Sequence, residues 1–290
     1  MTVELTRHQI QNLLQGIAIP PQPQVMVDLQ MEQCSPSCSV ERIAELICQD
    51  VGLSGSILKT VNSPFLRSNK TITSITQAVS LLGADSVINL VNALSIKGTL
   101  SDDDIIALGS FWDSALEVAM ASAVIAKEIG LQNPDEAYTL GLFHNCGVPL
   151  LMARFDNYRQ VCQESYANPG TSITEIENTH LKTNHAVVGY FVAKSWNLPP
   201  YLCQAIHEHH NVDKVFAREK TENRKKYLLA ILKMAEHICA LYQQLGGQST
   251  DYEWEQIGET ILIYAGLSQY DFENISSQVN ELGFGEADYH

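Results

Sequence analysis

Histidine is the residue type in this sequence that most clearly indicates chemistry. Six of the nine histidines lie between positions 144 and 210 of the 290-residue chain. Five of these six occur in three short segments, namely His144-Asn145, His185, and His207-Glu208-His209-His210. The first of these segments also holds an amide, and the last holds a carboxylate. Neutral imidazole nitrogens, together with carboxylate oxygens, are ligands that suit zinc, iron, nickel or manganese. The pattern therefore raises the hypothesis of a metal site.

The spacing within the last segment determines which histidines can act together. His207 and His210 stand three positions apart, so both can face one point if the segment is helical. His209 and His210 are neighbours, and neighbouring side chains on a helix point about 100° apart. These two histidines can bind one ion only if the backbone bends between them.

The composition of the chain argues against several classes of function. The net charge of −15 repels a phosphate backbone, so nucleic acid is not an expected partner. No apolar run reaches the ~18 residues that a membrane span needs, and the N-terminus lacks the parts of a signal peptide. The seven cysteines are odd in number and scattered, as is usual for reduced thiols. We expect a cytoplasmic protein without a membrane partner, and nothing in the sequence indicates its oligomeric state.

The elements that position the histidines are predicted to be helices. Ser39 and Ser74 each precede apolar residues with helical spacing, so both are predicted N-caps. Further helices are predicted over residues 110–129, 135–143, 174–193, 201–210 and 227–245. No alternating run of β-branched residues is long enough to build a sheet. The predicted fold class is therefore all-α.

Two packed helical subdomains are predicted within this all-α fold. The segment at residues 99–104 is polar and acidic and has no apolar period, so it marks the best boundary. The predicted subdomains are residues 1–105 and residues 106–290.

The histidine segments resemble a known family. Residues 141–147, which read GLFHNCG, resemble the segment that names the HD phosphohydrolases, in which His-Asp stands at this place. The residues that follow in the order of the related HDOD domain (HD-related output domain) are Glu177, His185, Gly189, Trp196-Asn197-Leu198-Pro199 and His209-His210. The N-terminal half is similar to the same domain at residues 19–23 and at Asn62-Ser63. The resemblance runs from about residue 17 to residue 240, and it implies an HD-phosphohydrolase-like bundle in a bacterial type of signalling protein.

The sequence departs from the catalytic HD pattern at several positions. That pattern uses a first histidine, a His-Asp pair and a later aspartate. No histidine lies near residues 112–114, where the first would fall, and Asn145 and Glu236 stand at the two aspartate positions. A neutral amide is a much weaker metal ligand than a carboxylate, and the site also loses one negative charge. HDOD domains are generally regarded as non-catalytic, and the resemblance implies the same here.

We therefore predict a vestigial site without catalytic residues. Its members are His144, Asn145, Glu177, His185, His209, His210 and Glu236. No cofactor is expected. The alternative is weak binding of a residual divalent ion (zinc, manganese, iron or nickel), with the candidate ligands His144, His185, His209, His210, Glu236 and Asp113. A simpler hypothesis makes His144 a buried, hydrogen-bonded histidine at a helix end that is paired with Asn145 and binds no metal.

The function predicted from the resemblance is a non-catalytic signal-transduction module that acts through protein partners of a signalling pathway. The alternative is a metal-dependent phosphohydrolase or phosphodiesterase acting on a nucleotide or a cyclic dinucleotide. Two features disfavour the alternative: Val148 stands where a lysine would follow the His144 turn, and no Gly-Tyr-Pro follows His209-His210. A transcription regulator is a third hypothesis, which the net charge disfavours.

Overall fold

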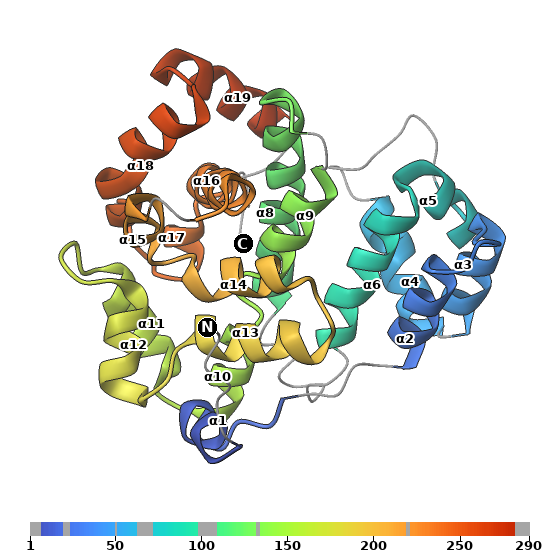
Figure 1. Cartoon of the computed structure of the whole chain (residues 1–290), viewed down its shortest axis with the longest axis horizontal. Coiled ribbons are helices and arrows are strands. Elements are labelled where there is room, and N and C mark those ends of the chain that lie inside the picture. Colours follow the sequence, from blue (N-terminus) through green and yellow to red (C-terminus); the bar gives the residue numbers. More distant parts are fainter. Residues whose placement is uncertain are drawn as a thin grey trace.

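The protein is all-α, as predicted. The computed structural model describes residues 7–19, 24–49, 51–62, 72–97, 109–131, 134–218 and 221–281, and every regular element in these ranges is a helix (Figure 1). The predicted boundary at residues 99–104, most of the proline-rich segment 19–23 and Ser63 lie outside these ranges. None of the described helices is long and apolar enough to cross a bilayer.

The first group of helices carries the caps that the sequence predicts. It consists of α2 (Gln24–Gln33), α3 (Val40–Cys48), α4 (Val51–Val61), α5 (Ile75–Leu82) and α6 (Ala84–Lys97). The Oγ atoms of Ser39 and Ser74 accept hydrogen bonds from backbone N–H groups in the first turns of α3 and α5. Asn62 connects the end of α4 to the segment before α5 through two hydrogen bonds. Its Nδ2 donates to the backbone oxygen of Ile72, and its Oδ1 accepts from the backbone N–H of Ile72.

In the second group, helices α8, α9, α14, α15 and α17 to α19 pack against α16 (Figure 1). The members of the second group are α8 (Gly109–Glu128), α9 (Pro134–Phe143), α10 (Val148–Arg154), α11 (Tyr158–Tyr166), α12 (Ile173–Leu181), α13 (His185–Ser195), α14 (Pro200–Glu208), α15 (Val212–Ala217), α16 (Asn223–Ile238), α17 (Leu241–Gln244), α18 (Tyr252–Ala265) and α19 (Gln269–Glu281). The alanine-rich α8 lies very close to α9: a Cβ on Gly141 would be 2.8 Å from the Cα of Ala119. This close packing fixes α9, the helix that ends just before His144.

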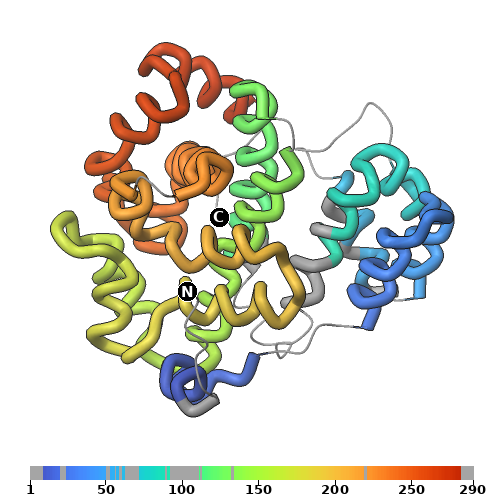
Figure 2. Tube along the Cα trace, viewed as in Figure 1, coloured from blue at the N-terminus to red at the C-terminus, as the bar shows by residue number. Residues whose placement is uncertain are grey.

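The two helical groups pack against each other through α6 and α9. Ser86 on α6 donates a hydrogen bond to the Asp135 carboxylate on α9, and Gln30 bonds the backbone oxygen of Trp196. The Trp196 side chain is fully buried. The first helix, α1 (Arg7–Leu14), packs against α13, and Figure 2 shows α1 at the bottom of the view, away from α2 to α6 on the right. Two packed helical subdomains are therefore present.

Three predicted helices end earlier than expected, and two of these changes affect the histidines. The helix predicted over residues 227–245 ends at Ile238, and the left-handed Ala240 separates it from α17. The helix predicted over residues 174–193 is broken into α12 and α13, because Lys182 adopts a left-handed conformation and Asn184 caps α13 by accepting from Val187 N. The helix predicted over residues 201–210 ends at Glu208. The two breaks have one consequence: His185, His209 and His210 all lie at helix ends instead of within helices.

Close backbone packing at Gly147 gives a testable prediction for stability. A Cβ at this position would lie 2.1 Å from the backbone oxygen of His185, so neither residue can keep its place if Gly147 is replaced. We expect Gly147→Ala to lower the free energy of unfolding by about 2–3 kcal/mol or more. The control is Gly55→Ala in α4, where a Cβ meets nothing within 4 Å and should stabilise by about 0.5–1 kcal/mol. Urea unfolding of both variants measures this, and equal stabilities would contradict the close packing.

Candidate functional site: a buried histidine centre

Four buried histidines meet between the helix ends. His144 follows α9, His185 begins α13, and His209 and His210 follow α14. Their rings are in contact. The ring centroid of His185 lies 5.1 Å from that of His209 and 4.9 Å from that of His210, and the ring centroids of His144 and His209 are 5.4 Å apart. We call these four residues the histidine centre. The turn after Glu208 is the bend that lets His209 and His210 face one place.

Each histidine of the centre has its Nδ1 atom held by an oxygen. The Nδ1 atoms of His144 and His209 lie 2.6 Å from the backbone oxygens of Gly141 and Ile206. The Nδ1 atom of His185 lies 2.8 Å from the Glu177 carboxylate, and that of His210 lies 3.0 Å from the Glu253 carboxylate. Because these oxygens are acceptors, the Nδ1 atoms are the donors. A neutral imidazole that donates from Nδ1 leaves a lone pair on Nε2.

These Nε2 lone pairs lack ordinary partners. The Nε2 atoms of His185 and His209 are 3.2 Å apart. The Nε2 of His144 is 3.3 Å from Oε1 of Glu236, yet neither atom makes a hydrogen bond within the described residues, and the same holds for Nε2 of His210. Two lone pairs at such distances repel each other unless a cation lies between them. The centre is therefore arranged to hold a cation, which is either a proton or a metal ion.

The charges around the centre favour a cation as well. Three carboxylates contact the histidine centre. Those of Glu177 and Glu253 bond Nδ1 of His185 and of His210, and that of Glu236 lies 3.3 Å from Nε2 of His144. They are opposed by one ammonium, because Nζ of Lys233 lies 2.6 Å from Glu236 and 3.0 Å from Glu253. With all three carboxylates ionised, this local group carries two uncompensated negative charges. One divalent ion would balance them.

Burial keeps three histidines of the centre, His144, His209 and His210, neutral. It lowers the pKa of His144 to about 3 and lowers the pKa of His209 and His210 well below the usual range, with Lys233 adding to these shifts. Burial also raises the pKa of Glu236 to about 7 despite the neighbouring ammonium. Neutral imidazole is the form that binds metal, so these shifts prepare the nitrogens as ligands.

The residues present fit a divalent transition metal. The ligand atoms of His185, His209 and His210 all lie within 4.8 Å of one another. Nδ1 atoms bonded to carboxylates and carbonyls form the outer support that metal-binding histidines usually have. His144 and Glu236 would complete such a site, and a bound ion would supply Lewis acidity there. Nitrogen ligands favour zinc, nickel or iron over magnesium.

Two predicted site residues, Asn145 and Asp113, differ from the rest in their contacts. Asn145 is buried beside His144, and neither its Oδ1 nor its Nδ2 finds a hydrogen-bond partner in the described part of the chain. Asp113 is exposed, and it is not a member of the metal-binding group of histidines that the described residues form. His207 is exposed as well and packs against Tyr190, so it does not join His210.

Sequence reasoning missed three residues that shape the centre, namely Lys233, Glu253 and Tyr158. Lys233 stands three positions before Glu236 on α16, a spacing that places both on one face, so a local signal existed. Glu253 on α18 had none, because it is 43 residues from the histidine that it contacts. Tyr158 was missed for the same reason; its hydroxyl donates to Glu177 at 2.5 Å.

The support of His185 by Glu177 gives a second prediction. Glu177 is buried and accepts from both Nδ1 and the backbone N–H of His185. We expect Glu177→Gln to weaken zinc binding about 10–100-fold, because the amide orients and polarises the imidazole less well. The control is Glu164→Gln, which breaks an exposed pair with His180 and should leave zinc affinity unchanged. Calorimetric titration with zinc measures both, and equal affinities for the two variants would contradict this role.

The fold and the site together define an all-α protein with a buried histidine centre. A family model of the HDOD domain matches residues 19–212, more than half of the chain, and the chain belongs to the HDOD family. A curated relative, an uncharacterized protein of Treponema pallidum (strain Nichols), is 28% identical over 196 residues. The match covers 67% of this chain but only 38% of that protein, so the chain spans well under half of its relative's length.

Solved structures show the same fold. An HDOD domain protein of unknown function from Geobacter sulfurreducens has a TM-score of 0.66 at 22% identity, over 94% of this chain and 96% of its own. A candidate phosphohydrolase from Shewanella amazonensis SB2B has a TM-score of 0.65 at 24% identity, over 93% and 94%. A candidate signal transduction protein from Marinobacter aquaeolei VT8 has a TM-score of 0.66 at 20% identity, over 93% of this chain and 58% of its own.

Proposed function

We propose that the chain is a non-catalytic regulatory module that acts through protein partners and retains a metal-binding histidine centre. The observation that supports the non-catalytic part is the ammonium of Lys233, whose Nζ lies 2.6 Å from Glu236. A hydrolytic HD centre needs its carboxylates to hold metal and a nucleophilic water. Here one carboxylate is bound to lysine, and the other is replaced by the buried amide of Asn145.

The relatives support a role for this module in passing a signal to other protein segments. The match covers 38% of the Treponema pallidum protein and 58% of the Marinobacter aquaeolei chain, so similar segments occur within longer proteins. A helical module that occurs with other segments is suited to pass a signal by packing against them. Protein partners are therefore favoured over a small-molecule substrate.

The metal part of the proposal follows from the donor set. The four Nε2 atoms of the histidine centre favour zinc, nickel or iron as ligands, and the surrounding charge suits a divalent ion. His144, His185, His209 and His210 would hold the ion, and because they lie at the ends of α9, α13 and α14, its binding would link these helix ends. Its role here is structural, and no hydrolytic step is assigned to it.

An activity assay tests the proposal. The chain is loaded with manganese, iron, zinc or magnesium and offered phosphate esters, mononucleotides and cyclic dinucleotides. We expect no turnover above that of the His144→Ala variant, because the carboxylates that position a nucleophilic water are absent or paired. Turnover that disappears in His144→Ala would show a phosphohydrolase or phosphodiesterase and overturn the proposal.

A further inference from the structure

A chain of hydrogen bonds leads from helix α11 to the histidine centre. The hydroxyl of Tyr158, the first residue of α11, lies 2.5 Å from Oε1 of Glu177 on α12. The other oxygen of this carboxylate, Oε2, lies 2.8 Å from Nδ1 of His185, the first residue of α13. Nε2 of His185 in turn lies 3.2 Å from Nε2 of His209. Three successive helices are therefore joined to the centre through one carboxylate.

Tyr158 is the donor at the start of this chain. Burial, together with the neighbouring Glu177 carboxylate, raises the pKa of Tyr158 well above its usual range, so the phenol keeps its proton. Both residues are only 1% exposed, so water does not compete for their hydrogen bond. A distance of 2.5 Å is typical of a strong bond from a hydroxyl to a carboxylate. Loss of this donor would leave a buried carboxylate oxygen unsatisfied, which is costly.

The Glu177 carboxylate holds the backbone of His185 as well as its ring. Its Oε2 accepts from the backbone N–H of His185 at 3.1 Å. This N–H is one of the groups in the first turn of α13 that have no partner within the helix. Another, the N–H of Val187, is capped by Oδ1 of Asn184. Glu177 and Asn184 therefore each hold a different N–H group at the start of α13.

We propose that Tyr158 is a positioning residue for the histidine centre. It fixes one oxygen of the Glu177 carboxylate, so that the other oxygen stays aligned with the backbone and the imidazole of His185. Metal-binding histidines depend on the partner of their second ring nitrogen, and Tyr158 extends this support by one residue. Its effect on zinc affinity rests on the proposed metal binding, whereas its effect on the backbone of His185 does not.

Amide hydrogen exchange in the metal-free full chain tests the proposal without a metal. The variant is Tyr158→Phe, which removes only the hydroxyl. We expect the N–H of His185 to exchange at least about tenfold faster than in the parent, because the carboxylate that holds it is no longer fixed. The N–H of Val187 is the internal reference, since its cap does not involve Glu177, and its rate should change by less than about twofold. General loss of stability would accelerate both groups alike.

Zinc affinity, measured by calorimetric titration, gives a second test. We expect Tyr158→Phe to weaken zinc binding by about tenfold, at the lower end of the effect expected for Glu177→Gln. In a chain that already carries Glu177→Gln, the same substitution should weaken binding by less than about twofold, because the group through which Tyr158 acts is gone. A residue that merely supports the fold would have the same effect in both backgrounds.

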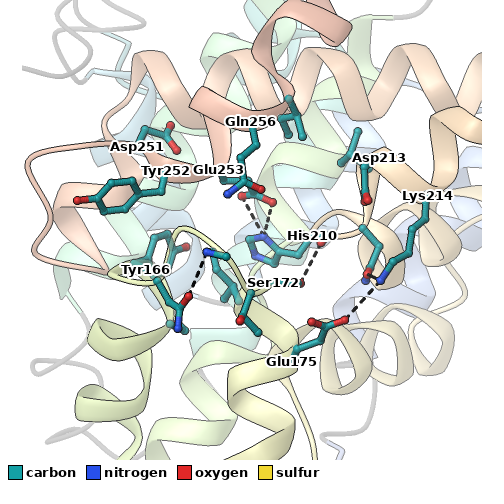
Figure 3. A pocket seen from close by; sticks show the side chains of 18 residues that line it. Tyr166, Ser172, Glu175, His210, Asp213, Lys214, Asp251, Tyr252, Glu253 and Gln256 are labelled. Carbon is teal, nitrogen blue, oxygen red and sulfur yellow. Dashed lines mark hydrogen bonds and ion pairs between the residues drawn. The ribbon is translucent and has the colours of Figure 1, made fainter.

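The matched control is Tyr166→Phe, which removes a hydroxyl from the last residue of the same helix. Tyr166 lines a cavity beside His210 (Figure 3), whereas the Glu177 carboxylate is bonded by Tyr158 and His185. We expect this control to change neither the exchange at His185 nor the zinc affinity by more than about twofold.

Three results would overturn the proposal. Tyr158→Phe could accelerate exchange at His185 and Val187 alike, it could leave both rates unchanged, or it could weaken zinc binding equally with and without the Glu177 carboxylate. A parent chain that binds no zinc would contradict the proposed metal site instead, and the exchange rates would then decide on Tyr158 alone.

Discussion

Asn145→Asp is expected to convert the histidine centre into a much stronger metal site. The substitution places a carboxylate next to His144 in a buried position, where the amide now has no hydrogen-bond partner among the described residues. A charged oxygen attracts a divalent ion far more strongly than a neutral carbonyl does. We expect the affinity for zinc or manganese to rise by about tenfold or more. Each factor of ten corresponds to about 1.4 kcal/mol of binding free energy.

The same substitution should make folding depend on metal. Without an ion, the new carboxylate is a buried charge without a partner, so the metal-free variant should unfold at a lower urea concentration than the parent. The control is Asp113→Asn, which removes an exposed acid that is not a member of the histidine centre and should leave zinc affinity unchanged. A folded Asn145→Asp variant that binds no more metal than the parent would show that the remaining ligands do not act together.

Lys233→Met is expected to have the largest effect on the stability of the metal-free protein. The Lys233 side chain is 3% exposed, and its ammonium lies between the carboxylates of Glu236 and Glu253. Although burial opposes the charge, these two partners raise the pKa of Lys233, so the ammonium stays charged. Its removal leaves the buried carboxylate of Glu236 and the half-buried carboxylate of Glu253 without an ammonium, which should cost about 3–5 kcal/mol.

Zinc should restore much of that loss, because it supplies the missing positive charge to Glu236. The control is Lys225→Met on the same helix. Lys225 is also largely buried and pairs with Glu208, but Glu208 keeps a second partner in Arg218. We expect Lys225→Met to cost about 1 kcal/mol, with no recovery on adding zinc. Equal losses in the two variants, or a loss in Lys233→Met that zinc leaves unchanged, would contradict the charge arrangement.

The helical fold was predictable because its signals are local. Ser39 and Ser74 cap helices as expected, and both precede an apolar period of the right length. The break between α12 and α13 was missed because an apolar pattern runs across it and hides the left-handed Lys182 and the capping Asn184. Propensity alone does not reveal such a break. The helix ends, however, decide where His185 and His209 point.

The candidate site was predictable only in part. The resemblance indicated which histidines lie together, and the structure brings His144, His185, His209 and His210 into contact. The charges that surround them depend on residues far apart in the chain. Glu253 contacts His210 across 43 residues, and no local pattern indicates such a contact. The sequence therefore favoured weak metal binding, whereas the anchored Nδ1 atoms and free Nε2 atoms favour a stronger site.

The central claim is that the histidine centre binds a metal but is non-catalytic. Measuring the metal content tests this claim most directly. The parent chain and His209→Ala are purified without added metal, and each is subjected to elemental analysis before and after exchange against zinc. We predict about one zinc, nickel or iron ion per parent chain, and a clear loss of that ion in His209→Ala. A folded parent chain that contains no transition metal and takes up no zinc would contradict the account.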